Sequence, residues 1–81
     1  MLTAAQMKAA RALLGWDQRR LADLSGVSLA TVRRMEGSED AVRGHVDTLV
    51  KIVDALEKGG VELIADGTAS SDGGRGVRLS A

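Results

Sequence analysis

Residues 18–37 read QRRLADLSGVSLATVRRMEG, and they contain two short amphipathic segments. Ser25-Gly26-Val27 separates the segments, and so short a connection favours a tight turn between two helices. A glycine within the connection can adopt the positive φ that such a turn requires. Ala22 provides the small side chain needed where two helices cross closely. We therefore predict two helices joined by a tight turn.

The second of these helices, predicted over residues 28–36, has two different sides. At about 100° per residue, Val32 and Met35 share one face, while Ala30 and Arg34 point the opposite way. The outward side combines arginines, a hydroxyl and small apolar groups. Arginine suits the edge of guanine, and an apolar contact suits the methyl group of thymine. The pattern favours a helix that reads the major groove of DNA.

The residues before this stretch predict another helix. Thr3 followed by Gln6 has the form of a capping box, and Gly15 is suited to end the helix. Its apolar stripe at helical spacing consists of Met7, Ala10, Leu13 and Leu14. Trp16 follows, and we expect it to cover the core between the first two helices.

After residue 44 a helical pattern gives way to a period of two. A fourth helix ending at Gly59-Gly60 is predicted from Val46, Leu49, Ile52, Val53 and Leu56. Residues 61–65 and 76–80 are typical of short strands, with a Gly- and Ser-rich loop between them. The predicted fold class is mainly α, with four helices and a short C-terminal β-hairpin or pair of strands.

Composition excludes several classes of function. The 81 residues allow a single core, which must be aliphatic because Trp16 is the only aromatic residue. The absence of cysteine and the single histidine, His45, exclude disulfides, thiol chemistry and the usual zinc sites. No apolar run reaches the ~18 residues of a membrane span, and the N-terminus does not resemble a signal peptide. We expect a cytoplasmic protein without a cofactor or metal.

The formal net charge is zero, but the charges are unevenly distributed along the chain. Residues 1–37 carry a net charge of +3, whereas residues 38–66 carry −4. A basic N-terminal part permits a DNA-binding face. Uneven sorting is also common in short chains, so charge alone does not establish one.

Residues 18–37 resemble the signature of the Cro/lambda-repressor (Xre) helix-turn-helix family of bacterial transcriptional regulators. The matching positions are Gln18, Ala22, Gly26, Val32 and the Glu36-Gly37 ending. The similarity extends over residues 3–58. It implies a lambda-repressor-like helical domain over residues 1–59 that binds duplex DNA through its third helix.

The resemblance also implies roles for individual residues. The positions that read bases in the family are occupied by Leu29, Ala30, Thr31, Arg33 and Arg34. The positions that contact phosphates are occupied by Gln18, Arg19, Ser28 and Arg43. Arg11 and Glu36 are expected to form a partly buried ion pair. Many relatives carry polar groups where this chain has Leu29 and Ala30, and Glu39-Asp40 is acidic near the expected DNA backbone. The alternative for the arginines is a solvated surface role.

Residues 60–81 form a predicted tail that we expect to hold a homodimer together. Each strand has one mainly apolar face, and the helical core does not obviously cover it. A lone two-stranded hairpin is marginal in water, so pairing of two tails in one sheet is an attractive solution. The residues assigned to this interface are Val61, Leu63, Ile64, Val77 and Leu79. The alternative is that the tail folds back onto its own fourth helix.

The function predicted from the sequence is a homodimeric repressor that is not an enzyme and that associates with the nucleoid through DNA. A chain of 81 residues leaves no room for a separate sensing domain, which favours repression. Two alternatives remain. One is the antitoxin of a toxin–antitoxin pair, which would bind both DNA and a toxin. The other is a protein-interaction adaptor that keeps the fold without binding DNA.

Overall fold

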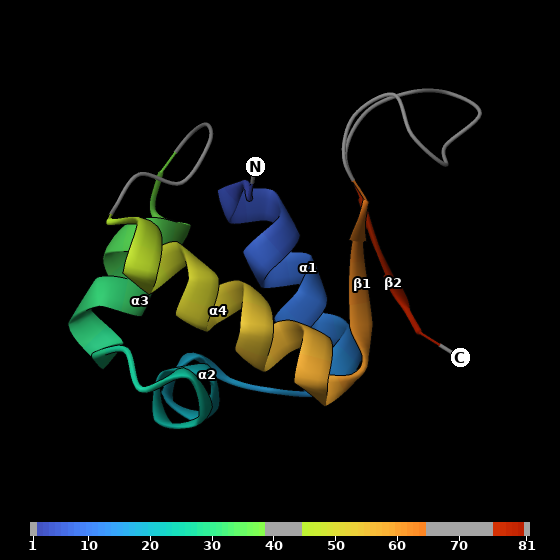
Figure 1. Cartoon of the computed structure of the whole chain (residues 1–81), viewed down its shortest axis with the longest axis horizontal. Coiled ribbons are helices and arrows are strands. Elements are labelled where there is room, and N and C mark those ends of the chain that lie inside the picture. Colours follow the sequence, from blue (N-terminus) through green and yellow to red (C-terminus); the bar gives the residue numbers. More distant parts are fainter. Residues whose placement is uncertain (1, 39–44, 65–75, 81) are drawn as a thin grey trace.

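The computed structural model describes residues 2–38, 45–64 and 76–80. In this part of the chain the elements are α1 (Ala4–Leu14), α2 (Gln18–Ser25), α3 (Leu29–Glu36), α4 (Val46–Gly59), β1 (Val61–Ile64) and β2 (Gly76–Leu79). α4 crosses the front of the molecule, with α2 and α3 toward one end and the hairpin beside α1 at the other (Figure 1). The predicted mainly α fold with a C-terminal hairpin is confirmed.

Local capping chemistry sets where the first three helices begin. The Thr3 hydroxyl accepts a hydrogen bond from the Gln6 amide at 3.1 Å, and Gln6 Oε1 accepts one from the Thr3 amide at 2.9 Å. This reciprocal capping box begins α1. The side chains of Asp17 and Ser28 each accept a hydrogen bond from a backbone amide three residues later. They satisfy amides that have no partner within α2 and α3.

The core is aliphatic, as the composition predicts. Its largest fully buried side chains are Met7, Leu21, Val32, Met35, Ile52, Leu56 and Val61. Leu13, which the apolar stripe predicts to point inward, is instead largely exposed at 44%, and Leu24 of α2 is 51% exposed. At the end of α1 it is Leu14 that packs against the core, so the neighbouring Leu13 turns toward solvent. The apolar stripe of α1 is therefore narrower than its sequence suggests.

Trp16 contacts α4 as well as lying between the first two helices, where the sequence predicts it. It lies in the linker between α1 and α2, and its indole ring packs against the last residue of α4, Gly59. A Cβ atom at Gly59 would lie 2.5 Å from Cη2 of the ring, closer than such contacts allow. The glycine therefore lets the aromatic ring close the end of α4.

The two strands pair with each other within the same chain. They are antiparallel, with Val61 opposite Leu79 and Leu63 opposite Val77. Val61 is 2% exposed, and Leu63 and Val77 pack against the core alongside the helices. This corrects the expectation that the helical core leaves the apolar face of the strands uncovered. α1 and α4 both contact the hairpin and cover it.

One buried side chain fastens the hairpin to α1. Gln6 Nε2 donates hydrogen bonds to the carbonyl oxygens of Ile64 and Gly76, both at 3.1 Å. The same amide group forms the capping box through its oxygen, so both of its ends are used. The hairpin thus packs in the same core as the helices and is hydrogen-bonded to α1. These contacts cross residue 60, where the sequence predicts that the helical domain ends and the tail begins. The loop expected at residues 66–75 lies outside the described residues.

Candidate nucleic-acid interface

The connection between α2 and α3 has the geometry that the sequence predicts. Gly26 adopts a left-handed backbone with φ of 75°, and its amide donates to the carbonyl of Ala22 at 3.0 Å. The Val27 amide donates to the hydroxyl of Ser25 at 3.2 Å. Ala22 and Val27 are buried where the two helices meet. The turn therefore fixes the direction in which α3 leaves α2.

The outward side of α3 carries cations beside a small apolar group. Ala30, Arg33 and Arg34 are exposed, whereas Val32 and Met35 are fully buried beneath them. Neither arginine forms an ion pair with any residue in the described part of the chain.

Leu29 and Thr31, in the first turn of α3, are less exposed than Ala30, Arg33 and Arg34. Leu29 is half-buried because it packs against the core. Thr31 is also half-buried, and its hydroxyl accepts a hydrogen bond from the Ser28 hydroxyl at 2.8 Å. Ser28 itself is exposed and caps the helix. Of the proposed base-reading residues, Leu29 and Thr31 thus offer only part of their side chains.

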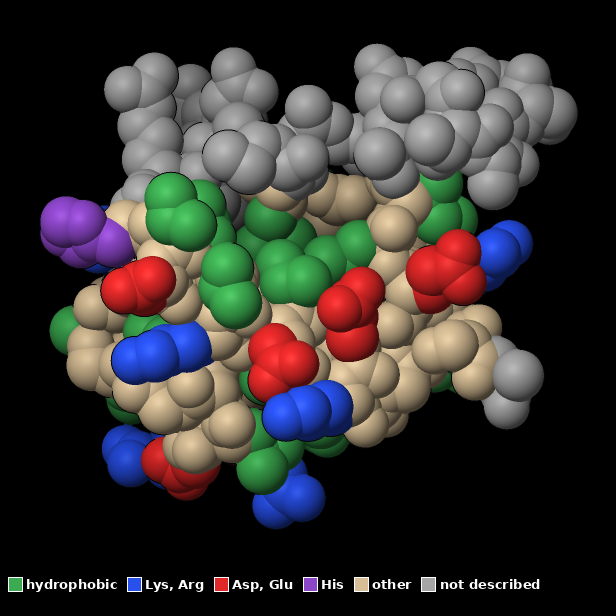
Figure 2. All heavy atoms as spheres, in the orientation of Figure 1, with side chains coloured by type: hydrophobic (Ala, Val, Ile, Leu, Met, Phe, Trp, Pro, Cys, Tyr) green, Lys and Arg blue, Asp and Glu red, His purple; other side chains and the backbone are tan. Residues whose placement is uncertain are grey.

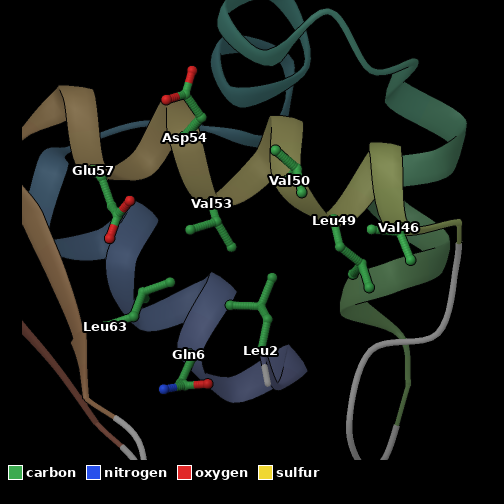
Figure 3. Close-up of a pocket in the computed structure, with 9 residues that line it drawn as sticks. All are labelled: Leu2, Gln6, Val46, Leu49, Val50, Val53, Asp54, Glu57 and Leu63. Atoms are coloured by element: carbon green, nitrogen blue, oxygen red, sulfur yellow. The ribbon is translucent and has the colours of Figure 1, made fainter.

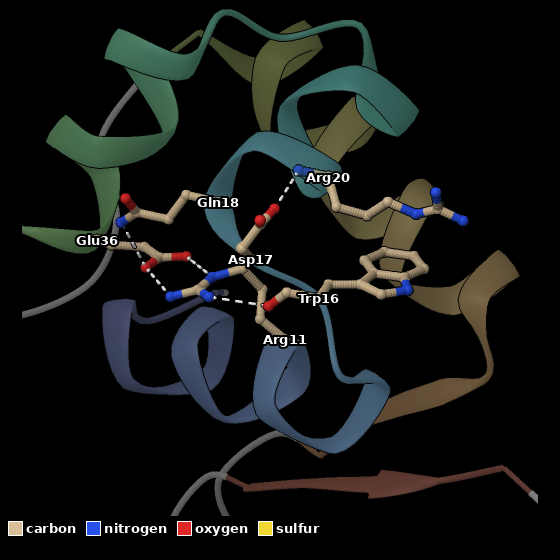
Figure 4. Close-up of polar contacts among 6 residues, drawn as sticks. All are labelled: Arg11, Trp16, Asp17, Gln18, Arg20 and Glu36. Atoms are coloured by element: carbon tan, nitrogen blue, oxygen red, sulfur yellow. Dashed lines mark hydrogen bonds and ion pairs between the residues drawn. The ribbon is translucent and has the colours of Figure 1, made fainter.

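The carboxylate of Glu36, at the end of α3, accepts hydrogen bonds from side chains of two other helices (Figure 4). Arg11 of α1 donates to both carboxylate oxygens, from Nε at 2.6 Å and from Nη2 at 2.7 Å. Gln18 of α2 donates from Nε2 to Glu36 Oε1 at 3.1 Å. Arg11 also donates from Nη1 to the carbonyl oxygen of Trp16 at 3.0 Å. One carboxylate thus ties α1, α2 and α3 together.

The ion pair is buried and electrostatically coupled. The side chains of Arg11 and Glu36 are 18% and 3% exposed. Burial by itself raises the pKa of Glu36, but the hydrogen bonds from Arg11 and Gln18 outweigh it, and the pKa lies below its ordinary value. The hydrogen bond to Glu36 raises the pKa of Arg11, against the opposing effect of burial. Both groups therefore stay charged at neutral pH.

The residues predicted to contact phosphate differ in their exposure and in their hydrogen bonds. Gln18 begins α2 and is held by Glu36 through one amide hydrogen, which leaves its second hydrogen for another acceptor. Arg19 is exposed beside it. Ser28 lies at the start of α3, across the turn from α2. Arg43 lies outside the described residues.

Sequence reasoning missed two polar contacts at these sites. The resemblance implied the pairing of Arg11 with Glu36, but it did not indicate that Gln18 joins the same carboxylate. Gln6 was expected only to cap α1, yet it also binds the hairpin. Nothing in the spacing of these residues signals contacts between elements so far apart in the chain.

Within residues 2–38, 45–64 and 76–80, no three His, Cys, Asp or Glu side chains are grouped so that they could hold a metal ion. No helix in that part of the chain is both long enough and apolar enough to span a membrane.

Comparison with known families agrees with the architecture. No individual curated protein matches the chain. The model of the helix-turn-helix family of the Cro/C1 type matches residues 7–63, a range that includes the α2–turn–α3 unit and the ion pair. The match covers well over half of the chain, and the chain therefore belongs to the Cro/C1-type family of DNA-binding helix-turn-helix regulators.

Proposed function

We propose that this protein is a sequence-specific transcriptional repressor that binds duplex DNA as a homodimer, with α3 in the major groove. The outer side of α3 carries this proposal, because Arg33 and Arg34 project from it with no partner in the described part of the chain. A helix that reads bases must also be held rigidly against the rest of the domain. α2 and α1 supply that support through Glu36.

The base-reading role is divided among the side chains of α3. Arg33 and Arg34 can each offer two donors to the O6 and N7 atoms of guanine. Ala30, exposed in the first turn of α3, suits the methyl group of thymine. Leu29 and Thr31 contribute at the edge of the contact, where only part of each side chain is exposed.

The phosphate-binding role belongs to the start of α2 and to its neighbours. Gln18 and the amides at the N-terminus of α2 present donors to a phosphate oxygen. Arg19 adds a cation beside them, and Ser28 adds a hydroxyl at the start of α3. Arg43 completes the proposed set of phosphate contacts. These groups would fix the position of α3 without selecting a sequence.

A repressor of this kind acts at the nucleoid in the cytoplasm and needs neither a cofactor nor catalytic chemistry. Dimerisation places two copies of α3 on the two halves of a palindromic site, about 34 Å apart. The tail is a weaker candidate for the dimer contact than its sequence suggests. Val61 is buried in its own chain, and Leu63 and Val77 pack inward, which leaves Ile64 and Leu79.

Selection of bound fragments from random duplex DNA, followed by titration of the selected site, tests the proposal. We expect a palindromic consensus and binding that weakens steeply as salt concentration rises. Equal affinity for the selected and scrambled duplexes would contradict sequence-specific repression. Absence of any binding at low salt would favour the adaptor alternative, and co-purification with a toxin would favour the antitoxin.

A further inference from the structure

The carboxylate of Glu36 holds the side-chain amide of Gln18 in one of its two orientations. Nε2 of Gln18 donates to Oε1 of Glu36 at 3.1 Å, and Figure 4 shows the nitrogen end of the amide turned toward Glu36. An ionised carboxylate only accepts hydrogen bonds. Turning the amide over would bring its oxygen against a carboxylate oxygen, and the two would repel each other. Glu36 thus decides which end of the Gln18 amide is anchored.

Arg11 makes this anchor compatible with a nearby phosphate. It donates to both oxygens of Glu36, at 2.6 and 2.7 Å, and the Glu36 side chain is 3% exposed. The two charges offset each other, so a phosphate that approaches Gln18 does not meet an unpaired carboxylate. Arg11 also donates from Nη1 to the carbonyl oxygen of Trp16, two residues before Gln18. The ion pair therefore holds both the side chain of Gln18 and the backbone that leads into α2.

The nitrogen of the Gln18 amide can donate to two anions at once. Phosphate and carboxylate oxygens both accept hydrogen bonds, and Nε2 carries two hydrogens. One hydrogen is donated to Glu36, which leaves the second for a phosphate oxygen. Gln18 is the first residue of α2, and the first backbone amides of a helix have no partner within it. The second hydrogen and these amides therefore lie at the same end of α2.

The face that α4 presents is less suited to the DNA backbone. Figure 2 shows acidic, basic and apolar side chains interspersed on this face. A groove of about 490 Å³ runs beside α4, and its charged lining residues in the described part of the chain are Asp54 and Glu57 (Figure 3). These carboxylates repel a phosphate. The start of α2, where Arg19 is exposed, offers a cation instead.

We propose that Glu36 is a positioning residue for the DNA backbone, because it holds Gln18 with the amide nitrogen ready to donate to a phosphate oxygen. This inference rests on the proposed function and adds to it a buried residue that acts through Gln18. A side chain that is already fixed loses less conformational entropy on binding than a free one. Glu36 is also the last residue of α3, so the phosphate contact is held in register with the helix that carries Arg34.

A double-mutant cycle on the full chain tests this role. Gln18→Ala and Glu36→Gln are made singly and together, and each protein is titrated against a duplex of scrambled sequence, where phosphate contacts dominate. We expect Glu36→Gln to weaken binding about fivefold when Gln18 is present, and less than about twofold in the Gln18→Ala background. A purely structural loss would weaken binding by the same factor in both backgrounds, and that result would overturn the proposal.

Glu57→Gln is the matched control, because it makes the same change of charge at an exposed carboxylate of α4. We expect this variant to bind the scrambled duplex like the parent, with or without Gln18. An effect as large as that of Glu36→Gln would trace the loss to net charge and overturn the role of Glu36.

The parent protein offers a second measurement that needs no change at Glu36. Proton–nitrogen correlation spectra resolve the two hydrogens on Nε2 of Gln18, which are assigned by their absence from Gln18→Ala. We expect the hydrogen donated to Glu36 to keep its chemical shift when the scrambled duplex is added, and the other hydrogen to shift. Loss of the first resonance, or no shift of the second, would overturn the proposal.

Failure of the positioning role differs from failure of the proposed function. A parent protein that binds duplex DNA, combined with equal effects of Glu36→Gln in the two backgrounds, overturns the role of Glu36 alone. A parent protein that binds no duplex at low salt overturns the repressor and, with it, the positioning role.

Discussion

The guanidinium of Arg11 donates to both oxygens of the Glu36 carboxylate, at 2.6 and 2.7 Å, and these hydrogen bonds join α1 to the last residue of α3. Removing one partner of such a buried pair leaves the other charged and desolvated. We expect Glu36→Ala to lower the free energy of unfolding by about 3 kcal/mol. Urea denaturation followed by circular dichroism measures this change.

Glu62→Ala is the control for that experiment. Glu62 also pairs with an arginine, Arg78, but their side chains are 47% and 55% exposed. An exposed pair contributes about 0–1 kcal/mol, so the control should be nearly silent. Equal losses in the two variants would show that the buried pair contributes no more than a surface pair.

The lowered pKa of Glu36 makes part of the stability depend on pH. A carboxyl group whose pKa is lower in the folded than in the unfolded protein stabilises the fold wherever it is ionised in both states. The advantage over Glu36→Gln should be complete above the ordinary pKa of 4.5. It should fade as the pH falls through the lower pKa of the folded state. Urea titrations of both proteins between neutral pH and about pH 3 follow this difference, and a constant difference would contradict the assignment.

Base reading and phosphate binding should respond differently to substitution. Arg34 lies on the exposed side of α3, and Arg34→Ala should cost about 1–3 kcal/mol on the selected site and relax the preference at one base pair. Gln18→Ala should weaken binding to the selected and scrambled duplexes alike, because a phosphate contact carries no sequence information. Titration of both variants against both duplexes separates these roles. Equal weakening by Arg34→Ala on the two duplexes would remove it from the base-reading set.

Gln18 has a second role that the titration must separate from the first. Its side chain also donates to Glu36, so Gln18→Ala removes a hydrogen bond within the protein. The free energy of unfolding of Gln18→Ala should therefore be measured beside its affinity. A stability loss of about 1 kcal/mol leaves the domain folded, and any drop in affinity then reports the phosphate contact.

The close approach of Trp16 to Gly59 gives an optical test of the core. A Cβ atom at Gly59 would lie 2.5 Å from the indole ring, so Gly59→Ala must displace the ring toward solvent. We expect a red-shifted fluorescence emission and a loss of about 1–3 kcal/mol in stability. Gly37→Ala is the matched control, because its nearest contact would be an ordinary 3.4 Å. Unchanged emission from Gly59→Ala would contradict the packing of Trp16 against α4.

Local chemistry explains why the helical part of the fold could be predicted from the sequence. Thr3, Asp17 and Ser28 cap the helices that follow them, and Gly26 turns the chain between α2 and α3. Each of these roles depends on a few neighbouring residues, which a sequence pattern records. The same holds for the outward position of Arg34, which follows from helical periodicity.

Contacts between distant elements could not be read in this way. The burial of Val61 depends on α1 and α4 lying together beside the hairpin, and the alternation within the strand only shows that one face is apolar. The exposure of Leu13 depends on which of two adjacent leucines meets the core. The base and phosphate contacts remain predictions, since they depend on a DNA partner that the fold alone does not supply.

The amide of Gln6 joins segments that are 58 and 70 residues away in the chain. Its oxygen accepts a hydrogen bond at the start of α1, and its nitrogen donates a hydrogen bond to one carbonyl of each strand. Fraying of the first turn of α1 therefore removes one attachment of both strands, and loss of the strands leaves a buried donor without an acceptor. We expect the amide protons of the first turn and of the hairpin to exchange with the same free energy of opening, as one cooperative unit. A protease that trims the C-terminal tail would thus loosen the opposite end of the polypeptide.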